Sequence, residues 1–262
     1  MNRYLKVLIL NTLLCISLTF IFQNNISYGQ SNNIDKLISI KNEEEYLNMR
    51  IKDLDYILKN KKQYKILNKD IKNASLVKKI SIDSLKYSQI KFFKMYFDRQ
   101  LMDCKKNENL LINKIKEERK EALENSDNTY IKGKWPIENY RYISSVYGYR
   151  VHPITKKISF HNGIDIPAPE NTSVVASDDG IVIFVGYKSG YGNVVEIEHF
   201  DSKKTLYAHN NSIVVSKGQV VKEGQVIAKV GSTGNSTGNH VHFEIKINNQ
   251  RINPLDGISN DI

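Results

Sequence analysis

The chain has 262 residues, of which 40% are hydrophobic and 25% are charged, so neither a wholly disordered chain nor a polytopic membrane protein fits it. Lys and Arg outnumber Asp and Glu by 38 to 28, a net charge of +10 that favours an anionic partner such as nucleic acid, a membrane surface or a cell-wall polymer. Two cysteines exclude a disulfide-stapled scaffold and a cysteine-built zinc site.

The first 30 residues have the pattern of an export signal. Arg3 and Lys6 accompany an apolar run over 5–22, and the small residues Ser27 and Gly29 follow it. We expect a secretory signal peptide over 1–30. Because the run is about 18 residues long, a retained membrane anchor is the alternative. Either outcome predicts a protein outside the cytoplasm, secreted to the cell wall or anchored and facing outward.

The next segment, 31–132, contains neither glycine nor proline, which favours long helices. Apolar residues step by four, three and four through Leu47, Ile51, Leu54 and Leu58, as in an amphipathic helix or a coiled coil. One such helix cannot bury its apolar seam alone, so the segment should fold back on itself or pair with a partner.

The charges of this segment allow two interpretations. Residues 31–130 carry 22 Lys and Arg against 16 Asp and Glu. A solvated helix face accounts for most of these charges, and a site for an anionic cell-wall polymer is the alternative. We expect 31–130 to mediate self-association or contact with an envelope protein.

The remaining segment, 133–262, holds all five prolines and thirteen of the fourteen glycines. Short apolar runs lie between the glycines, which is typical of many strands joined by turns. The predicted fold class is therefore α+β by segments, with a helical part followed by an all-β, mainly antiparallel domain.

Polar and apolar residues alternate strictly over 240–247, which predicts a half-buried strand with His240, His242, Glu244 and Lys246 on one face. Two histidines at this spacing can serve one small site, where one binds a metal and its neighbour handles a metal-bound water. Taken alone the pattern is weak, and paired surface histidines without a role are the ordinary interpretation.

A second pattern separates His161 from Asp165 by four positions. In an extended segment His161, Gly163 and Asp165 lie on one side, and Gly163 leaves room for an ion between the two possible ligands. One carboxylate and two imidazoles make a plausible zinc site, since Ca²⁺ and Mg²⁺ prefer oxygen ligands alone. His209 ends a third alternating stretch, and His199 lies at the end of a strand predicted over 194–200; in isolation each is most simply structural.

Taken together, these stretches resemble the M23 peptidases, the lysostaphin-like or LytM-type zinc endopeptidases of bacterial cell walls. The resemblance covers about 135–255, with every motif in the family's order. The matching motifs are SVYGYRVHP at 145–153, HNGIDI at 161–166, GYGN at 190–193, YAH at 207–209, GSTGNSTG at 231–238 and HVHFE at 240–244.

The resemblance implies roles for five residues. It makes His161, Asp165 and His242 the ligands of one Zn²⁺ per chain, and it makes His209 and His240 the catalytic histidines that do not bind the metal. The implied reaction is peptide-bond hydrolysis by a zinc-activated water. Either histidine can be the principal base, and we favour His240.

The implied function is an exported zinc metalloendopeptidase that cuts peptide cross-links or stem peptides of peptidoglycan. The alternative is a non-catalytic LytM-like envelope factor that activates another hydrolase or scaffolds a transenvelope complex. A nucleic-acid partner is not expected, because the sequence shows no readout motif for one.

Overall fold

The computed structural model describes residues 32–59, 87–126 and 130–259, except for 152 and 155. The chain divides into two compact units, 1–109 and 110–262, and the division falls inside helix α4 (Tyr87–Glu124). The expected signal peptide or anchor at 1–30 lies outside the described residues. The domain boundary expected at 132/133 stays a prediction.

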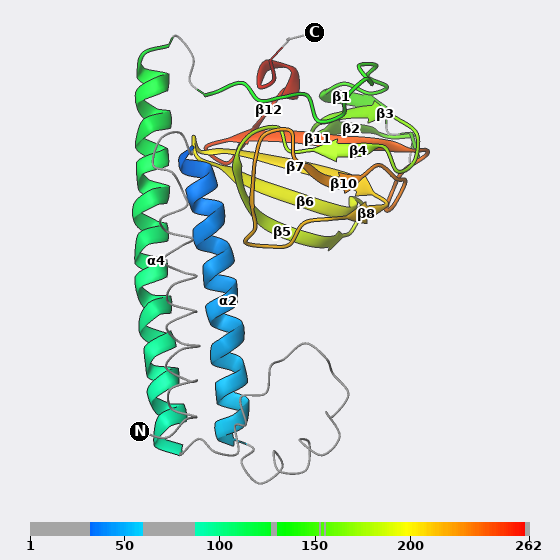
Figure 1. Ribbon diagram of the computed structural model, residues 1–262. Coiled ribbons are helices and arrows are strands. Elements are labelled where there is room, and N and C mark those ends of the chain that lie inside the picture. The colour runs from blue at the N-terminus through cyan, green and yellow to red at the C-terminus, as the bar shows by residue number, and fades with distance from the viewer. Residues whose placement is uncertain (1–31, 60–86, 127–129, 152, 155, 260–262) are drawn as a thin grey trace. The chain divides into compact units, whose positions relative to one another are not determined.

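The first unit contains helix α2 (Asn33–Lys59) and the first part of α4, which run antiparallel (Figure 1). The contacts between them include Lys41 to Glu108 at 2.6 Å, Lys94 to Asp55 at 3.5 Å, and the Cys104 thiol to the carbonyl of Ile40 at 3.4 Å. The prediction of long helices is confirmed over these two spans, and the described helices fold back on one another.

The apolar seam of α2 is only partly buried. Leu47 is 5% exposed, whereas Ile51, Leu54 and Leu58 are half-buried. A coiled coil therefore stays a prediction. Neither α2 nor α4 combines the length and the apolar character that a membrane-spanning helix requires.

The second unit is built mainly of short strands, as the glycine and proline spacing predicts. All of the paired strands are antiparallel, so the predicted fold class is confirmed. The strands are β1 (Gly148–Val151), β2 (Ile158–His161), β3 (Ile164–Pro167), β4 (Ser173–Val175), β5 (Gly180–Lys188), β6 (Gly192–His199), β7 (Lys203–Asn210), β8 (Ser212–Ile213), β9 (Val220–Val221), β10 (Val226–Lys229), β11 (His240–Ile247) and β12 (Gln250–Ile252), and a 3₁₀ turn, η3 (Pro254–Asp256), follows them.

A seven-stranded sheet organises this unit. Its order is β12-β11-β7-β6-β5-β9, and β3 pairs with β11 alongside this path. Two smaller sheets, β4-β10-β8 and β1-β2, belong to the same unit. Strands that pair are often far apart along the chain, and the pairing of β3 with β11 is one example.

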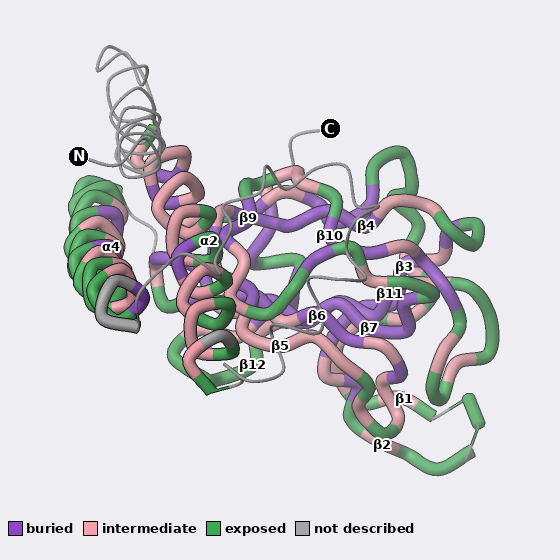
Figure 2. Tube along the Cα trace, turned by 60° about the horizontal axis from the view of Figure 1, so that its bottom comes forward, coloured by how far each residue is buried: buried purple, intermediate pink, exposed green. Residues whose placement is uncertain are grey.

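The two faces of the large sheet differ. Val241, Phe243 and Ile245 of β11 point into the main hydrophobic core with Val195 and Ile197 of β6. Figure 2 shows burial concentrated along β6, β7 and β11. Because side chains alternate along a strand, the opposite face of β11 carries His240, His242, Glu244 and Lys246. These are the residues that the sequence pattern placed together.

His199, at the end of β6, is buried away from that face. Its Nδ1 donates to the carbonyl of Asp179 at 3.0 Å, and its Nε2 lies 2.8 Å from the hydroxyl of Thr205. Burial and the nearby Lys203 lower the pKa of His199 to about 4, against the opposing effect of Asp178. The ring is therefore neutral at pH 7.

This burial predicts an acid-sensitive fold. Below its ordinary pKa of 6.5, His199 takes up a proton in the unfolded chain but not in the folded one, so stability falls as the pH drops from about 6.5 to about 4. Between pH 7 and pH 5 we expect His199 to account for a loss of about 2 kcal/mol in unfolding free energy. Denaturant titrations of the wild type and H199Q at both pH values test this. The variant should lose less stability than the wild type, and equal losses would contradict the prediction.

Candidate active site

The site forms where β3 pairs with β11. Asp165 and His242 stand directly opposite each other in this pairing, and His242 also faces Ala208 of β7 on its other side. His161 is the last residue of β2, just before β3 begins at Ile164. The strand register thus gathers three side chains that lie up to 81 residues apart in the sequence.

Gly163 has a different role from the one its position suggests. The space that a Cβ would need is filled by the carbonyl oxygen of Phe243, 2.2 Å from where that atom would sit. Gly163 therefore allows the backbone to pass close to β11, and the expectation that it makes room for an ion is wrong. The chain also bends at 162–163 instead of staying extended from His161 to Asp165.

Three potential ligand atoms converge at the centre of the site. His242 Nδ1 lies 2.9 Å from Asp165 Oδ1 and 3.0 Å from His161 Nε2, and His161 Nε2 lies 3.2 Å from Asp165 Oδ1. All three residues are buried, and suitable donor atoms of the group lie within 4.8 Å of one another. The structure brings together the three residues proposed from the sequence as ligands.

Each of the two ligand histidines has an inner ring nitrogen in the cluster and an outer one that points away from it. The partners of the outer nitrogens indicate which atoms carry the lone pairs. His161 Nδ1 lies 2.9 Å from the carbonyl oxygen of Val146, and His242 Nε2 lies 3.2 Å from Glu244 Oε1. Since both neighbours only accept hydrogen bonds, these nitrogens carry the protons and the inner nitrogens carry lone pairs. Two lone pairs and a carboxylate oxygen that face one another require a positive charge between them, and this donor set fits zinc.

The charges around the cluster favour that interpretation. Burial would raise the pKa of Asp165, but its contacts with the His161 and His242 rings hold that pKa far below its usual range. Burial would lower the pKa of His242, but hydrogen bonds with Asp165 and Glu244 raise it. The second oxygen of Asp165 lies 3.5 Å from the guanidinium of Arg150. The ionised carboxylate of Asp165 thus lies at the centre of the cluster, where it attracts a proton or a cation.

Two further histidines lie beside the cluster. The rings of His209 and His240 are 4.7 Å apart between centroids, and His240 Nε2 lies 3.6 Å from Asp165 Oδ1. His209 Nδ1 donates to the carbonyl of Thr233 at 2.7 Å, and His240 Nδ1 donates to the carbonyl of Gly238 at 2.8 Å. In the neutral form each ring therefore keeps Nε2 as a proton acceptor.

His209 is held in a strained and buried position. Its φ angle is +62°, in the left-handed region that histidine seldom occupies, and its backbone N–H donates to the carbonyl of Tyr191 at 2.9 Å. Burial lowers its pKa to about 4, assisted by His240 and His242 and opposed by the hydrogen bond with Thr233. The ring is neutral at pH 7. Backbone strain of this kind is concentrated at functional sites.

A hollow of about 460 Å³ opens over these groups. Its lining includes the five histidine and aspartate side chains just described, together with Arg150 and Tyr191. The loop 235–239 forms another part of the wall. This volume is within the range of pockets that hold small molecules or short peptide segments.

Residues 159–254 match the family model of Peptidase family M23. This part of the chain is an M23 peptidase domain. The match contains all five residues selected from the sequence, and it confirms the resemblance on which their expected roles depend.

Two relatives of the M23 domain are named as peptidases, and one of these two is named for peptidoglycan. A DD-carboxypeptidase/endopeptidase Mpg of Neisseria meningitidis is 49% identical over 126 residues, which are 47% of this chain and 29% of the relative. The peptidoglycan DD-endopeptidase ShyB of Vibrio cholerae is 40% identical over 131 residues, 49% of this chain and 30% of the relative. This chain therefore spans less than a third of the length of these relatives.

Among solved structures, a zinc-containing peptidase from Vibrio cholerae matches with 40% identity and a TM-score of 0.44, covering 48% of this chain and 39% of that one.

The M23 domain also holds contacts that sequence reasoning missed. The alternation of the sequence places Glu244 on the His242 face but indicates no role for it. Its carboxylate accepts hydrogen bonds from Tyr191 and Arg251, which lie 53 and 7 residues away. Burial raises its pKa, but hydrogen bonds from His242, Tyr191 and Arg251 lower it to about 2. Only the alternation of β11 could have singled it out.

Proposed function

We propose that this chain is an exported zinc metalloendopeptidase that hydrolyses peptide cross-links or stem peptides of bacterial peptidoglycan. One observation carries the proposal: the lone pairs of His161 and His242 converge with the Asp165 carboxylate in an open hollow, beside two more histidines. The M23 match and the endopeptidase names of the relatives support it.

In this proposal three atoms hold one zinc ion: His161 Nε2, Asp165 Oδ1 and His242 Nδ1. Three protein ligands leave a position for water or substrate, as in catalytic zinc sites. Zinc bound here would act as a Lewis acid and make a water molecule nucleophilic at neutral pH. The backbone carbonyl of Val146 and the carboxylate of Glu244 keep the two imidazoles turned toward the ion.

His240 and His209 move protons in this proposal. Each donates its Nδ1–H to a backbone carbonyl, so each has Nε2 free to accept a proton from the attacking water. We assign His240 as the principal base, because its Nε2 lies 3.6 Å from the ligand carboxylate of Asp165. The proton held on Nε2 is then available to the nitrogen of the leaving peptide.

The other parts of the chain have supporting roles in the proposal. We place the catalytic domain at 133–262 and expect residues 1–30 to direct export, which brings the enzyme to its substrate. The +10 net charge favours attraction to anionic cell-wall polymers. The helical segment 31–130 would position the enzyme through self-association or an envelope partner.

Defined muropeptides test the proposed reaction. The full chain, stripped of metal and reloaded with one equivalent of zinc, should cleave a D,D-cross-linked muropeptide dimer into two monomers. Mass spectrometry of the products identifies the bond that is cut. A dimer joined by a glycine bridge serves as the comparison substrate, and the metal-free chain serves as the inactive control.

A folded, zinc-loaded chain that cleaves neither dimer nor uncross-linked stem peptides would contradict the enzymatic proposal. That result would favour the non-catalytic envelope factor. The presence of all three ligand residues and both further histidines favours the enzyme, because a scaffold needs none of them.

A further inference from the structure

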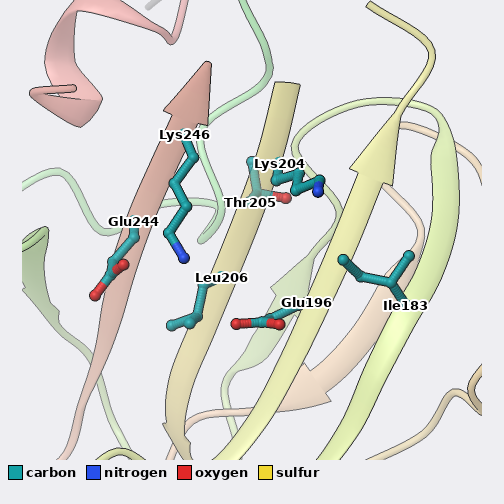
Figure 3. Close-up of a pocket in the computed structure, with 7 residues that line it drawn as sticks. All are labelled: Ile183, Glu196, Lys204, Thr205, Leu206, Glu244 and Lys246. Atoms are coloured by element: carbon teal, nitrogen blue, oxygen red, sulfur yellow. The ribbon is translucent and has the colours of Figure 1, made fainter. Parts of the chain in front are cut away.

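Glu244 is a fully buried carboxylate in the middle of β11, with a side-chain exposure of 0%. Figure 3 shows it on the strand that also carries Lys246, next to Leu206 of β7. Removing a carboxylate from water is costly unless it is paired and hydrogen-bonded. Its contacts therefore indicate what this position is built to do.

Three donors from separate parts of the domain converge on this carboxylate. His242 Nε2 lies 3.2 Å and the Tyr191 hydroxyl 2.7 Å from Oε1, while Arg251 Nε lies 2.9 Å from Oε2. Arg251 belongs to β12, and Tyr191 lies between β5 and β6. The position of the carboxylate is thus set by three elements and not by β11 alone.

The contact between Glu244 and His242 determines which ring nitrogen of His242 carries the proton. An ionised carboxylate only accepts hydrogen bonds, so the nitrogen facing Glu244 must carry the ring proton. The other nitrogen, Nδ1, then has its lone pair toward Asp165 and His161. Without an acceptor at Nε2, the ring could take the opposite tautomer or rotate, and the lone pair would be lost from the cluster.

We propose that Glu244 is a positioning residue that locks His242 in its metal-binding tautomer, and that Tyr191 and Arg251 hold Glu244 in place. The inference rests on the proposed zinc centre. Arg251 balances the charge of the carboxylate, and Tyr191 is itself approached by the side-chain amide of Asn162 at 3.4 Å. Asn162 follows the ligand His161 directly, so the network joins the surroundings of two of the three ligands.

A simple ion pair that only stabilises the fold is the competing explanation, and zinc affinity separates the two. The affinity of the full chain is measured by competition with a chromophoric chelator, in the wild type, E244Q and E244A. Thermal melting of the metal-free proteins reports the stability of the fold. E196Q is the matched control. Glu196 and Glu244 both line the small pocket of Figure 3, and Glu196 pairs with Lys188 at 2.7 Å without touching the cluster.

We expect E244A to weaken zinc binding by about 10- to 100-fold, the usual effect of removing a partner of a metal-binding histidine. E244Q keeps an acceptor oxygen and the shape of the side chain, so its loss should be smaller and about tenfold at most. E196Q should bind zinc as the wild type does. The absorption spectrum of the cobalt-substituted chain should change in E244A and stay unchanged in E196Q.

Folded E244A and E244Q proteins that bind zinc as tightly as the wild type would overturn the proposal. If the wild type itself takes up no zinc, the metal centre and this role fail together. If the wild type binds zinc and Glu244 variants weaken it, while no muropeptide is cleaved, the positioning role stands and only the proposed peptidase activity fails.

Discussion

Replacing Asp165 or His242 with alanine is expected to release zinc from the chain and to abolish hydrolysis. Each variant removes one of three converging ligand atoms, and the two that remain cannot hold the ion tightly. We expect turnover to fall about a thousandfold or more, which corresponds to about 4 kcal/mol of transition-state stabilisation. Metal analysis of the dialysed protein and cleavage of a muropeptide dimer measure the two effects.

The loss must be distinguished from unfolding. Asp165 also pairs with Arg150, so D165N, which keeps the shape of the side chain, accompanies the alanine variant. E170A is the matched control, because Glu170 is an exposed carboxylate that lies five positions after Asp165. Circular dichroism should show the same folded domain in all variants. Full zinc occupancy in both D165A and H242A would rule out the ligand assignment.

Local patterns predicted the elements of the fold well. Eight strictly alternating residues predicted the strand that β11 forms over His240–Ile247, and the absence of glycine and proline predicted the helices over 33–59 and 87–124. Both signals depend on neighbours in the sequence, because periodicity and backbone freedom are local properties. The segment between those helices lies outside the described residues.

Contacts between distant strands could not be predicted in this way. The pairing of Asp165 with His242 is set by the register of β3 against β11, which no local pattern specifies. Gly163 shows the same limit: its position between two ligands suggested an ion cavity, whereas the backbone of β11 fills that space. The family resemblance, and not the spacing, selected the ligand set from the available histidines.

The contacts that orient the site were the least accessible from sequence. The role of Glu244 depends on Tyr191 and Arg251, which belong to other parts of the domain. The left-handed backbone of His209 depends on how the end of β7 packs against Tyr191 and Thr233. Such geometry results from tertiary packing, so it appears only once the strands are assembled.

Replacing His240 with alanine is expected to leave zinc bound but to reduce kcat strongly. His240 holds no ligand atom of the converging group, yet its Nε2 is a free proton acceptor 3.6 Å from Asp165 Oδ1. General-base catalysis contributes about 10²- to 10⁴-fold, so kcat should fall by that factor while KM changes little. H209A should also keep its zinc, and its kcat should fall less if His240 is the principal base.

Steady-state kinetics with a soluble muropeptide dimer, combined with metal analysis of the same samples, test this separation of roles. H199Q is the matched control, because it removes a buried histidine of the same sheet that lies outside the cluster. An H240A protein that cleaves at the wild-type rate would refute its role as base, and a larger loss in H209A would transfer that role to His209. If H240A instead loses its zinc, His240 belongs to the ligand set and the division between ligands and proton carriers is wrong. The distances favour the division. The three ligand atoms lie 2.9 to 3.2 Å from one another, whereas His240 Nε2 lies 3.6 Å from Asp165 Oδ1.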